Sequence, residues 1–457
     1  VMNLRYEVVL IELRYTVTPY KYTLGLEYIA SYLQSKEISC RNFVFEAQLI
    51  DSVVNEIVKY RPKIIGIHFY REAESTIFSI ARKIKQLDDQ IKIVVGGHTA
   101  SLFAYSILEK EPCIDIVSFG EGEKTFEELW KIISSNGELD KCKGIFYRKN
   151  NYIMKNSERE LIENLDELPY PALDILKDEA SGSNAIFAAI STSRGCLGNC
   201  RFCISNRVFD NPNRKRWRGR TPENIIGEIL RLKMSFPNKR ISYRIVDGSI
   251  EDPNPQNKER LYSLISLYEE NEIRIPFEVL TRAESWGKKD IPLIKRMVRA
   301  GLYAVDIGFE ASTERSLRLF NKKSQMEDNY RAYRIFKECG VEVYGFIIMF
   351  HPYTTFEELR DNAKFLLEVD MAYQPQSWWA ELFLWPDSKI LPQIVKDGLL
   401  LGFEDKGYRM KYGFVDGKVE RAYHFMKKVS ELEGTQAYWE AVEKVKIECI
   451  LYYKWKE

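Results

Sequence analysis

Residues 194–203 read Arg-Gly-Cys-Leu-Gly-Asn-Cys-Arg-Phe-Cys, which spaces Cys196, Cys200 and Cys203 as C-x3-C-x2-C. The segment follows an apolar stretch, Phe187–Thr192, that has the length and composition of a buried strand. Thiolates are the ligands that iron–sulfur clusters and zinc favour, so three of them on one short loop predict a metal centre. Three ligands also leave one iron of a [4Fe–4S] cluster open, which suits a site that binds a further molecule.

A structural zinc site of three cysteines and one histidine is the alternative. The chain has only four histidines, and the nearest, His98, lies far upstream, whereas structural zinc ligands come in close pairs. The sequence therefore favours the iron–sulfur cluster. The other cysteines are too sparse for a disulfide scaffold, so we expect a reducing, cytoplasmic setting; they are Cys40, Cys113, Cys142, Cys339 and Cys449.

Downstream of the apolar stretch, strand-like and helix-like segments alternate. The predicted strands are Phe187–Thr192, Ser242–Val246, Ile275–Leu280, Ala304–Phe309, Val341–Met349 and Met371–Trp379. Helical spacing falls between them, over Pro222–Met234, Lys258–Asn271, Ile291–Ala300, Met326–Cys339 and Phe356–Val369. Such a βα series predicts a partial (β/α)6 barrel over residues 185–380, with its chemistry at the carboxyl ends of the strands.

Upstream, the same alternation predicts a second α/β domain over residues 1–143. Strand candidates are Glu7–Leu13, Arg41–Phe45, Lys63–His68, Lys92–Gly96 and Ile114–Ser118, with helices over Leu24–Gln34, Asp51–Tyr60, Ala73–Leu87 and Lys124–Ser134. The pattern is that of an open, doubly wound parallel sheet, whose ligands bind beyond the carboxyl ends of the strands. Those ends carry Tyr70, Arg71, Gly97, His98, Gly120, Glu121 and Gly122.

Two further segments complete the expected organisation. Residues 144–184 hold a short hairpin around Asn150-Asn151 and a polar, proline-containing linker. Residues 381–457 are aromatic-rich and form a small C-terminal domain or a cap over the substrate. Its aromatic residues and carboxylates, such as Trp385 and Glu381, either clasp a cationic or sugar-like small molecule or simply pack a core.

The charge balance argues against two classes of partner. The chain has 67 basic and 66 acidic residues, a formal net charge of +1, so it offers no large field for nucleic acid or an anionic membrane. No segment has the apolar length of a membrane span. The first residues, 1–15, contain four charged side chains and are typical of a strand, not of a secretory signal.

The cysteine triplet after a first barrel strand resembles the signature of the radical S-adenosylmethionine (SAM) superfamily. The resemblance extends over about residues 186 to 379 and implies a [4Fe–4S] cluster held by Cys196, Cys200 and Cys203, with SAM bound beside it. By their match to family motifs, the residues implied for SAM are Phe202, Asp247, Arg282, Glu310, Ser312 and Ile348. One family feature, a G-G-E tripeptide for the SAM amino group, is absent.

The N-terminal sheet resembles the cobalamin-binding subgroup of this superfamily, in which strand-end loops hold the corrin ring and its nucleotide tail. The resemblance implies cobalamin contacts for the two glycine turns, with residues Gly97, His98, Gly120, Glu121 and Gly122. The D-x-H-x-x-G motif, which supplies a lower axial histidine, is absent. Tyr70 or Arg71 is then the candidate for the lower face of cobalt. The alternatives are that Arg71 starts a helix facing solvent, and that the domain keeps the sheet without the cofactor.

The resemblance implies an enzyme that cleaves SAM reductively to a 5′-deoxyadenosyl radical and methylates an unactivated carbon of a small molecule or natural-product intermediate through methylcobalamin. The electron would come from a reducing partner such as flavodoxin or ferredoxin. One alternative is a radical SAM epimerase, dehydratase or ring-rearranging enzyme, with Cys339 or Cys449 as a possible hydrogen donor. A second is a non-catalytic iron–sulfur electron carrier, although a carrier favours four cysteines.

Overall fold

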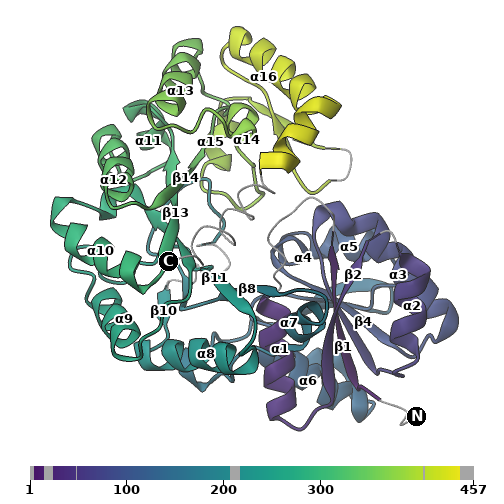
Figure 1. Ribbon diagram of the computed structural model, residues 1–457. Helices are drawn as coiled ribbons and strands as arrows, with labels where there is room; N and C mark the ends of the chain where they lie inside the picture. The colour runs from purple at the N-terminus through teal and green to yellow at the C-terminus, as the bar shows by residue number, and fades with distance from the viewer. Residues whose placement is uncertain (1–4, 15–23, 48, 206–216, 405–406, 443–457) are drawn as a thin grey trace. The chain divides into compact units, whose positions relative to one another are not determined.

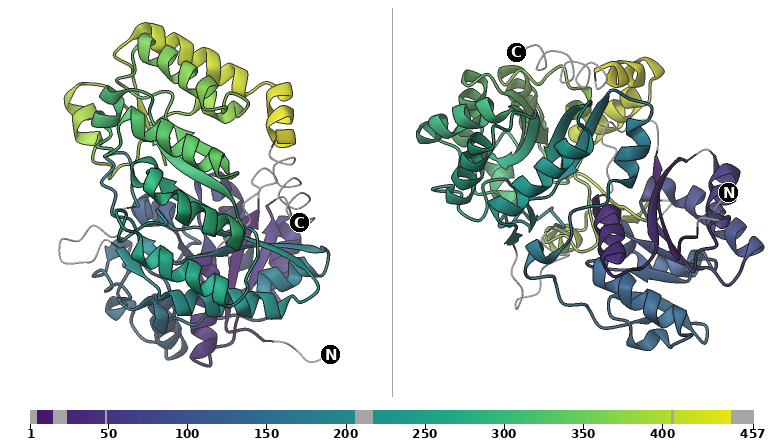
Figure 2. Two further views of the ribbon diagram at one scale, coloured as in Figure 1. Left: turned by 60° about the vertical axis from the view of Figure 1, so that its left-hand side comes forward. Right: turned by 60° about the horizontal axis from the view of Figure 1, so that its bottom comes forward.

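The computed structural model describes residues 5–14, 24–47, 49–205, 217–404 and 407–442 (Figure 1). The chain divides into two compact units, residues 1–183 with 406–408, and residues 184–405 with 409–457. Two further views of both units are given in Figure 2. Cys449 lies outside the described residues, so the structure does not place it.

The first unit is built on a seven-stranded sheet in the order β2-β1-β3-β4-β5-β6-β7. Strands β1 to β5 are parallel, and β6 and β7 form an antiparallel hairpin that continues the sheet. Their bounds are β1 Val8–Arg14, β2 Cys40–Glu46, β3 Ile64–His68, β4 Lys92–Gly96, β5 Ile116–Ser118, β6 Ile145–Lys149 and β7 Tyr152–Lys155. The predicted doubly wound parallel sheet is confirmed.

Helices cover both faces of this sheet (Figure 1). Their bounds are α1 Leu24–Ser35, α2 Ile50–Val58, α3 Glu74–Leu87, α4 His98–Leu102, α5 Ala104–Lys110, α6 Glu123–Ser134 and α7 Asp174–Ala180. Leu10 of β1 and Phe126 of α6 belong to one core cluster with residues of α1. Gly66 is required there, because a Cβ atom on it would lie 2.6 Å from Leu10 Cδ2 and 2.8 Å from Phe126 Cε1.

The second unit is a parallel sheet of five strands in chain order, β8-β11-β12-β13-β14. The strands are β8 Ala185–Ile190, β11 Arg240–Ile245, β12 Phe277–Arg282, β13 Leu302–Glu310 and β14 Glu342–Ile347. The intervening helices lie along its outer side (Figures 1 and 2), with bounds α8 Pro222–Ser235, α9 Glu259–Glu270, α10 Ile291–Ala300, α11 Glu314–Leu319, α12 Met326–Glu338 and α13 Phe356–Glu368. The predicted partial parallel barrel is confirmed.

The sixth strand predicted over Met371–Trp379 is wrong. Helix α14 occupies Pro375–Trp379 instead, and Pro375 stands in its first turn, where a missing backbone N–H costs nothing. Beyond it, a single parallel bridge joins Glu381 to Phe350 after β14. The apolar composition of the segment was the correct signal of burial, but the proline marks a helix start.

Most of the remaining described residues belong to the second unit. They form α15 Leu391–Lys396, the strand pair β15 Leu400–Phe403 and β16 Met410–Tyr412, and α16 Gly417–Ser430. Leu384, Ile390 and Tyr412 share a core cluster with Leu317 and Phe320, which lie at α11. Part of the C-terminal region therefore packs against α11, which follows β13.

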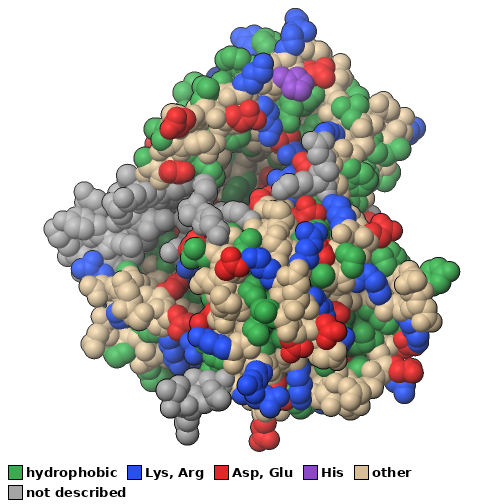
Figure 3. All heavy atoms as spheres, turned by 90° about the vertical axis from the view of Figure 1, so that its right-hand side faces the viewer, with side chains coloured by type: hydrophobic (Ala, Val, Ile, Leu, Met, Phe, Trp, Pro, Cys, Tyr) green, Lys and Arg blue, Asp and Glu red, His purple; other side chains and the backbone are tan. Residues whose placement is uncertain are grey.

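Two surface properties bear on partners. Among the described residues, no helix combines the length and hydropathy needed to cross a membrane. On the face drawn in Figure 3, lysine and arginine side chains alternate with aspartate and glutamate, in agreement with the balanced charge of the sequence.

The α10–β13 junction gives a prediction about stability. Gly301 ends α10 with φ +120°, and a Cβ atom on it would lie 2.3 Å from the carbonyl oxygen of Ile275. We expect Gly301→Ala to lower the free energy of unfolding by about 2 kcal/mol or more, because it adds a backbone clash to the cost of a left-handed alanine. Denaturant unfolding followed by circular dichroism measures the change.

Gly340, after α12, is the matched control. It has φ +77°, and nothing lies within 4 Å of a Cβ atom built on it. Gly340→Ala should cost only about 1 kcal/mol, since it carries the conformational cost alone. Equal losses for the two variants would contradict the importance of the Ile275 contact.

Candidate functional site

The three cysteines lie on the loop that follows the first barrel strand. Strand β9 (Ser193–Gly195), paired with β10 (Trp217–Gly219), leads into the loop, and all three thiols are half-buried and free of disulfides. A Cβ atom on Gly198 would lie 3.3 Å from Cys196 Sγ and 3.9 Å from Cys200 Sγ. Gly198 thus keeps open the space beside the two sulfur atoms, and its N–H donates to Cys196 Sγ at 3.3 Å.

Three free thiols on one loop have the ligand type and number that fit a [4Fe–4S] cluster with one open iron. Among the described residues, no three histidine, cysteine, aspartate or glutamate side chains meet closely enough to hold one metal ion. Ligands of a [4Fe–4S] cluster each bind a different iron and stand further apart. Burial raises the pKa of the Cys200 thiol to about 12, so metal binding there must displace a proton.

The cysteine loop is held in place from two sides. The Asn199 carbonyl accepts a hydrogen bond from Asn321 Nδ2 at 2.8 Å, and its side-chain oxygen accepts one from Lys389 Nζ at 2.7 Å. The Arg201 N–H donates to the Phe320 carbonyl at 2.9 Å, and the Arg201 carbonyl accepts from Ile390 N–H at 3.0 Å. The turn after α11 and the segment before α15 therefore fix the backbone between the cysteines.

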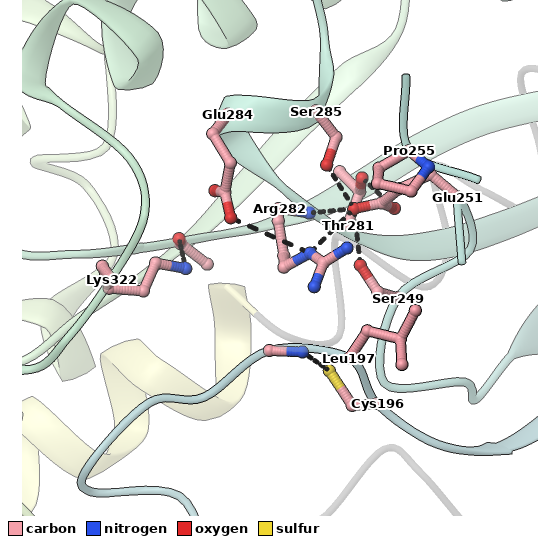
Figure 4. Close-up of polar contacts among 12 residues, drawn as sticks. Cys196, Leu197, Ser249, Glu251, Pro255, Thr281, Arg282, Glu284, Ser285 and Lys322 are labelled. Carbon is pink, nitrogen blue, oxygen red and sulfur yellow. Dashed lines mark hydrogen bonds and ion pairs between the residues drawn. The ribbon is translucent and has the colours of Figure 1, made fainter. Parts of the chain in front are cut away.

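Arg282, at the end of β12, reaches toward this loop (Figure 4). Its Nε lies 3.2 Å from Glu251 Oε1 and its Nη2 lies 2.6 Å from Asp252 Oδ1. The remaining nitrogen, Nη1, lies 3.7 Å from the position of a Cβ atom on Gly198. Two buried carboxylates thus orient the guanidinium so that one N–H-bearing nitrogen faces the cysteine loop.

Glu251 is the buried anchor of this arrangement. Its carboxylate accepts hydrogen bonds from Ser249 Oγ at 2.6 Å, Thr281 Oγ1 at 2.7 Å and Ser285 Oγ at 2.7 Å. Burial alone would raise the pKa of Glu251, but Arg282 and the three hydroxyl groups together lower it. The carboxylate is therefore charged at neutral pH and keeps Arg282 in position.

Glu310 ends β13 in a strained conformation. Its φ is +66°, in the left-handed region, and the β13–β14 register shifts between Gly308 and Glu310. Lys322 Nζ donates to the Gly308 carbonyl at 2.9 Å. Burial raises the pKa of Glu310 against the attraction of Lys322. Strain of this kind in a non-glycine residue is typical of functional sites.

The other residues implied for SAM lie at the same strand ends. Phe202 packs edge-on against Phe320, with ring centroids 5.3 Å apart. Ser312 donates its N–H to Asn362 Oδ1 at 3.3 Å, and the half-buried Ile348 donates its N–H to the Glu310 carbonyl at 2.8 Å.

Asp247 is buried after β11, and its carboxylate is occupied by the segment after β8. It accepts from the N–H groups of Thr192 at 2.7 Å and Ser193 at 3.0 Å, and from both hydroxyl groups. It therefore joins two strand ends.

In the first unit, the residues predicted to contact cobalamin follow the carboxyl ends of the parallel strands. Tyr70 and Arg71 follow β3, and Gly97 and His98 follow β4. The strand order changes direction at β1 and β3, which is where ligands of such sheets bind. The Tyr70 hydroxyl donates to the Leu13 carbonyl, and Arg71 pairs with its neighbour Glu72 at 2.9 Å. His98 begins α4 with an exposed side chain.

The turn after β5 is shaped by close packing. A Cβ atom on Gly122 would lie 2.5 Å from Ile29 Cδ1, whereas one on Gly120, with φ +78°, would meet nothing within 4 Å. Glu121 is buried and accepts a hydrogen bond from the Ile162 N–H at 2.7 Å. Of the three, Gly120 thus leaves the most open space.

Sequence reasoning missed several residues that the structure brings to the cysteine loop. At the loop itself these are Gly248, Asp252 and Lys389. Glu251 and Glu284 contact Arg282, which faces the loop. A signal existed for two of them: consecutive acids, Glu251 and Asp252, follow a predicted strand at its carboxyl end. No local pattern could have linked Lys389 to Asn199.

Comparison with known proteins identifies both units. Residues 190–366 match the radical SAM superfamily and residues 10–130 match the B12 binding domain. The chain thus belongs with the radical SAM proteins that carry a B12-binding domain. It is a cobalamin-dependent radical SAM enzyme, for which the two domains imply a [4Fe–4S] cluster, SAM, cobalamin and a source of electrons.

Its relatives span most of its length. An uncharacterized methyltransferase of Pyrococcus horikoshii is 27% identical over 90% of this chain and 85% of that protein. Cytidylyl-2-hydroxyethylphosphonate methyltransferase of Streptomyces wedmorensis is 23% identical over 86% of this chain and 81% of that protein. Among solved structures, the cobalamin-dependent radical enzyme OxsB has a TM-score of 0.75 at 19% identity, covering 93% of this chain and 66% of its own. TsrM of Kitasatospora setae has a TM-score of 0.70 at 15% sequence identity, covering 92% of this chain and 88% of its own. These two show the fold.

Removing one thiol tests the cluster. We expect Cys200→Ser to leave the anaerobically reconstituted chain without cluster iron and without its brown absorbance, because a serine hydroxyl does not replace a thiolate toward iron. SAM cleavage should be lost with it. Cys339→Ser, at the end of α12, is the control and should load normally. Full iron content in Cys200→Ser would contradict the assignment.

The clamp on Asn199 can be tested separately. We expect Lys389→Met to speed removal of iron by a chelator about fivefold, the factor for a hydrogen bond worth roughly 1 kcal/mol. Lys396→Met, on the exposed side of α15, should have no effect. In an Asn199→Ala background the Lys389 substitution should add nothing, since its partner is gone; additive effects would contradict the clamp.

Proposed function

We propose that the chain is a C-methyltransferase that uses SAM and cobalamin to methylate an unactivated carbon of a small molecule or natural-product intermediate. The observation that carries the proposal is that two relatives matching over more than four fifths of this chain bear the name methyltransferase. The pairing of a cobalamin domain with a radical SAM domain supports it. An unactivated carbon needs both a radical to remove hydrogen and a methyl donor, which the two bound cofactors supply.

The protein's own part is to hold and orient these groups. We propose that Cys196, Cys200 and Cys203 hold the cluster. SAM would lie across the barrel mouth, with Nη1 of Arg282 toward its carboxylate. The other proposed SAM neighbours are Phe202, Asp247, Glu310, Ser312 and Ile348. The buried carboxylate of Asp247 would act mainly by fixing the strand ends, because Thr192 and Ser193 already occupy it.

We further propose that cobalamin binds at the carboxyl edge of the first sheet, against Gly97, His98, Gly120, Glu121 and Gly122. Tyr70 and Arg71 are proposed to face the cobalt from the end of β3. An arginine there cannot ligate cobalt, and it disfavours a further ligand on that side. The position of both residues at the change in strand order supports this proposal.

A ring rearrangement is the second candidate. A relative in Priestia megaterium, 25% identical over 76% of this chain, is named 4′-phospho-dehydrooxetanocin synthase. An epimerase that uses Cys339 as hydrogen donor has less support. Cys339 ends α12, which runs antiparallel to the strands, so it lies at the end of the barrel opposite the cysteine loop. A protein that only carries electrons would not need SAM.

The substrate side is partly constrained. Glu381, one carboxylate considered for clasping a cation, already bonds to Arg409, Lys427 and the Tyr423 hydroxyl. That cluster carries more positive than negative charge, which favours an anionic or neutral small molecule near it over a cationic one.

The proposed electron donor is a flavodoxin or ferredoxin, and the proposed setting of the enzyme is the cytoplasm.

Labelled SAM separates the two candidates. The chain is reconstituted anaerobically with iron, sulfide and hydroxocobalamin, desalted, reduced and incubated with methyl-labelled SAM and an extract of small molecules. Methyl transfer predicts retained corrin absorbance, and S-adenosylhomocysteine and 5′-deoxyadenosine in equal amounts. 5′-Deoxyadenosine without S-adenosylhomocysteine would favour rearrangement, and loss of the corrin on desalting would overturn the methyltransferase proposal.

A further inference from the structure

Glu284 is an acidic side chain at the barrel mouth to which no role has been assigned so far. It lies in the short turn η4 (Ala283–Ser285), two residues after Arg282. Its side chain is 19% exposed, and Oε1 is 3.9 Å from Arg282 Nε. Its other oxygen, Oε2, is buried and has no hydrogen-bond partner within the described part of the chain. A buried carboxylate oxygen without a donor is costly, so it points to a missing ligand.

The neighbouring cations are already bonded elsewhere. Arg282 makes shorter contacts with Glu251, at 3.2 Å, and Asp252, at 2.6 Å. Lys322 Nζ donates to the Gly308 carbonyl at 2.9 Å. Figure 4 shows the Glu284 carboxylate between Arg282 and Lys322, on the side of Arg282 away from Glu251. Oε2 of Glu284 can therefore accept a hydrogen bond from a ligand in the space beside Arg282 and Lys322.

The charges around this space are unbalanced. Arg282 and Lys322 face four carboxylates: Glu251, Asp252, Glu284 and Glu310. Such a surface favours a ligand with a net positive charge. SAM carries a sulfonium, an amino group and one carboxylate, so its charge is complementary to this surface.

We propose that Glu284 is the positioning residue for the α-amino group of SAM, accepting an N–H hydrogen bond through Oε2. Nη1 of Arg282, which faces Gly198 and the sulfur atoms of Cys196 and Cys200, takes the adjacent carboxylate. One turn of chain then presents an acceptor and a donor, two residues apart, to the two polar groups of the amino-acid end. The proposal depends on SAM as ligand and not on methyl transfer, so it applies to either candidate function.

The test compares three ligands on the reconstituted chain: SAM, its deaminated analogue and its decarboxylated analogue. Dissociation constants come from anaerobic equilibrium dialysis, and the EPR spectrum of the reduced cluster reports binding next to the iron. We expect Glu284→Gln to weaken SAM and decarboxylated SAM about tenfold, the loss expected for one charge-assisted hydrogen bond, and deaminated SAM less than about twofold. Iron content should stay at the wild-type level.

Glu270→Gln, on the exposed end of α9, is the matched control and should change none of the three constants. Unchanged SAM affinity in Glu284→Gln would overturn the proposal. So would losses for SAM and deaminated SAM that spare decarboxylated SAM, because Glu284 would then act only by orienting Arg282. If the variant fails to load iron, the wild-type chain still decides: equal affinity for SAM and its deaminated analogue overturns the proposal.

Discussion

One buried carboxylate, that of Asp252, joins the cysteine loop to the arginine that faces it. Its Oδ2 accepts a hydrogen bond from the Leu197 N–H at 3.0 Å, and its Oδ1 accepts one from Arg282 Nη2 at 2.6 Å. One side chain thus fixes the loop that carries the thiols and the arginine that faces them, and it is 1% exposed. Removing one member of a buried ion pair costs about 3–5 kcal/mol, because the other charge stays buried without its partner. Loop and guanidinium are therefore held as one unit.

Local patterns predicted most of the strands, because buried parallel strands such as β8 are continuous apolar runs between turns. The thiol loop was also predictable, because its three ligands lie close together in the sequence. The sixth strand was not, because Pro375 makes an apolar segment a helix start. The partners of the loop were also hidden. Asn199 meets Lys389 from 190 positions away, and single-sequence patterns carry no information about such pairs.

The same physical reasoning explains why the substrate is harder to predict than the cofactors. The cofactors carry the difficult chemistry, and the protein binds them with short motifs at strand ends that are shared across different reactions. Relatives of this chain accordingly bear names as different as cytidylyl-2-hydroxyethylphosphonate methyltransferase and 4′-phospho-dehydrooxetanocin synthase. The C-terminal residues packed against α11 also contact the cysteine loop, through Lys389 and Ile390.

The barrel mouth combines features that lower stability. Glu310 holds a left-handed backbone conformation that costs a non-glycine residue about 1–2 kcal/mol. Glu284 keeps a buried oxygen that receives no hydrogen bond from the described residues, and burial raises the pKa of Glu310. These costs occur together at the carboxyl ends of the barrel strands. A ligand that supplies N–H donors and positive charge would relieve the cost at the two carboxylates, so binding and local folding should be coupled here.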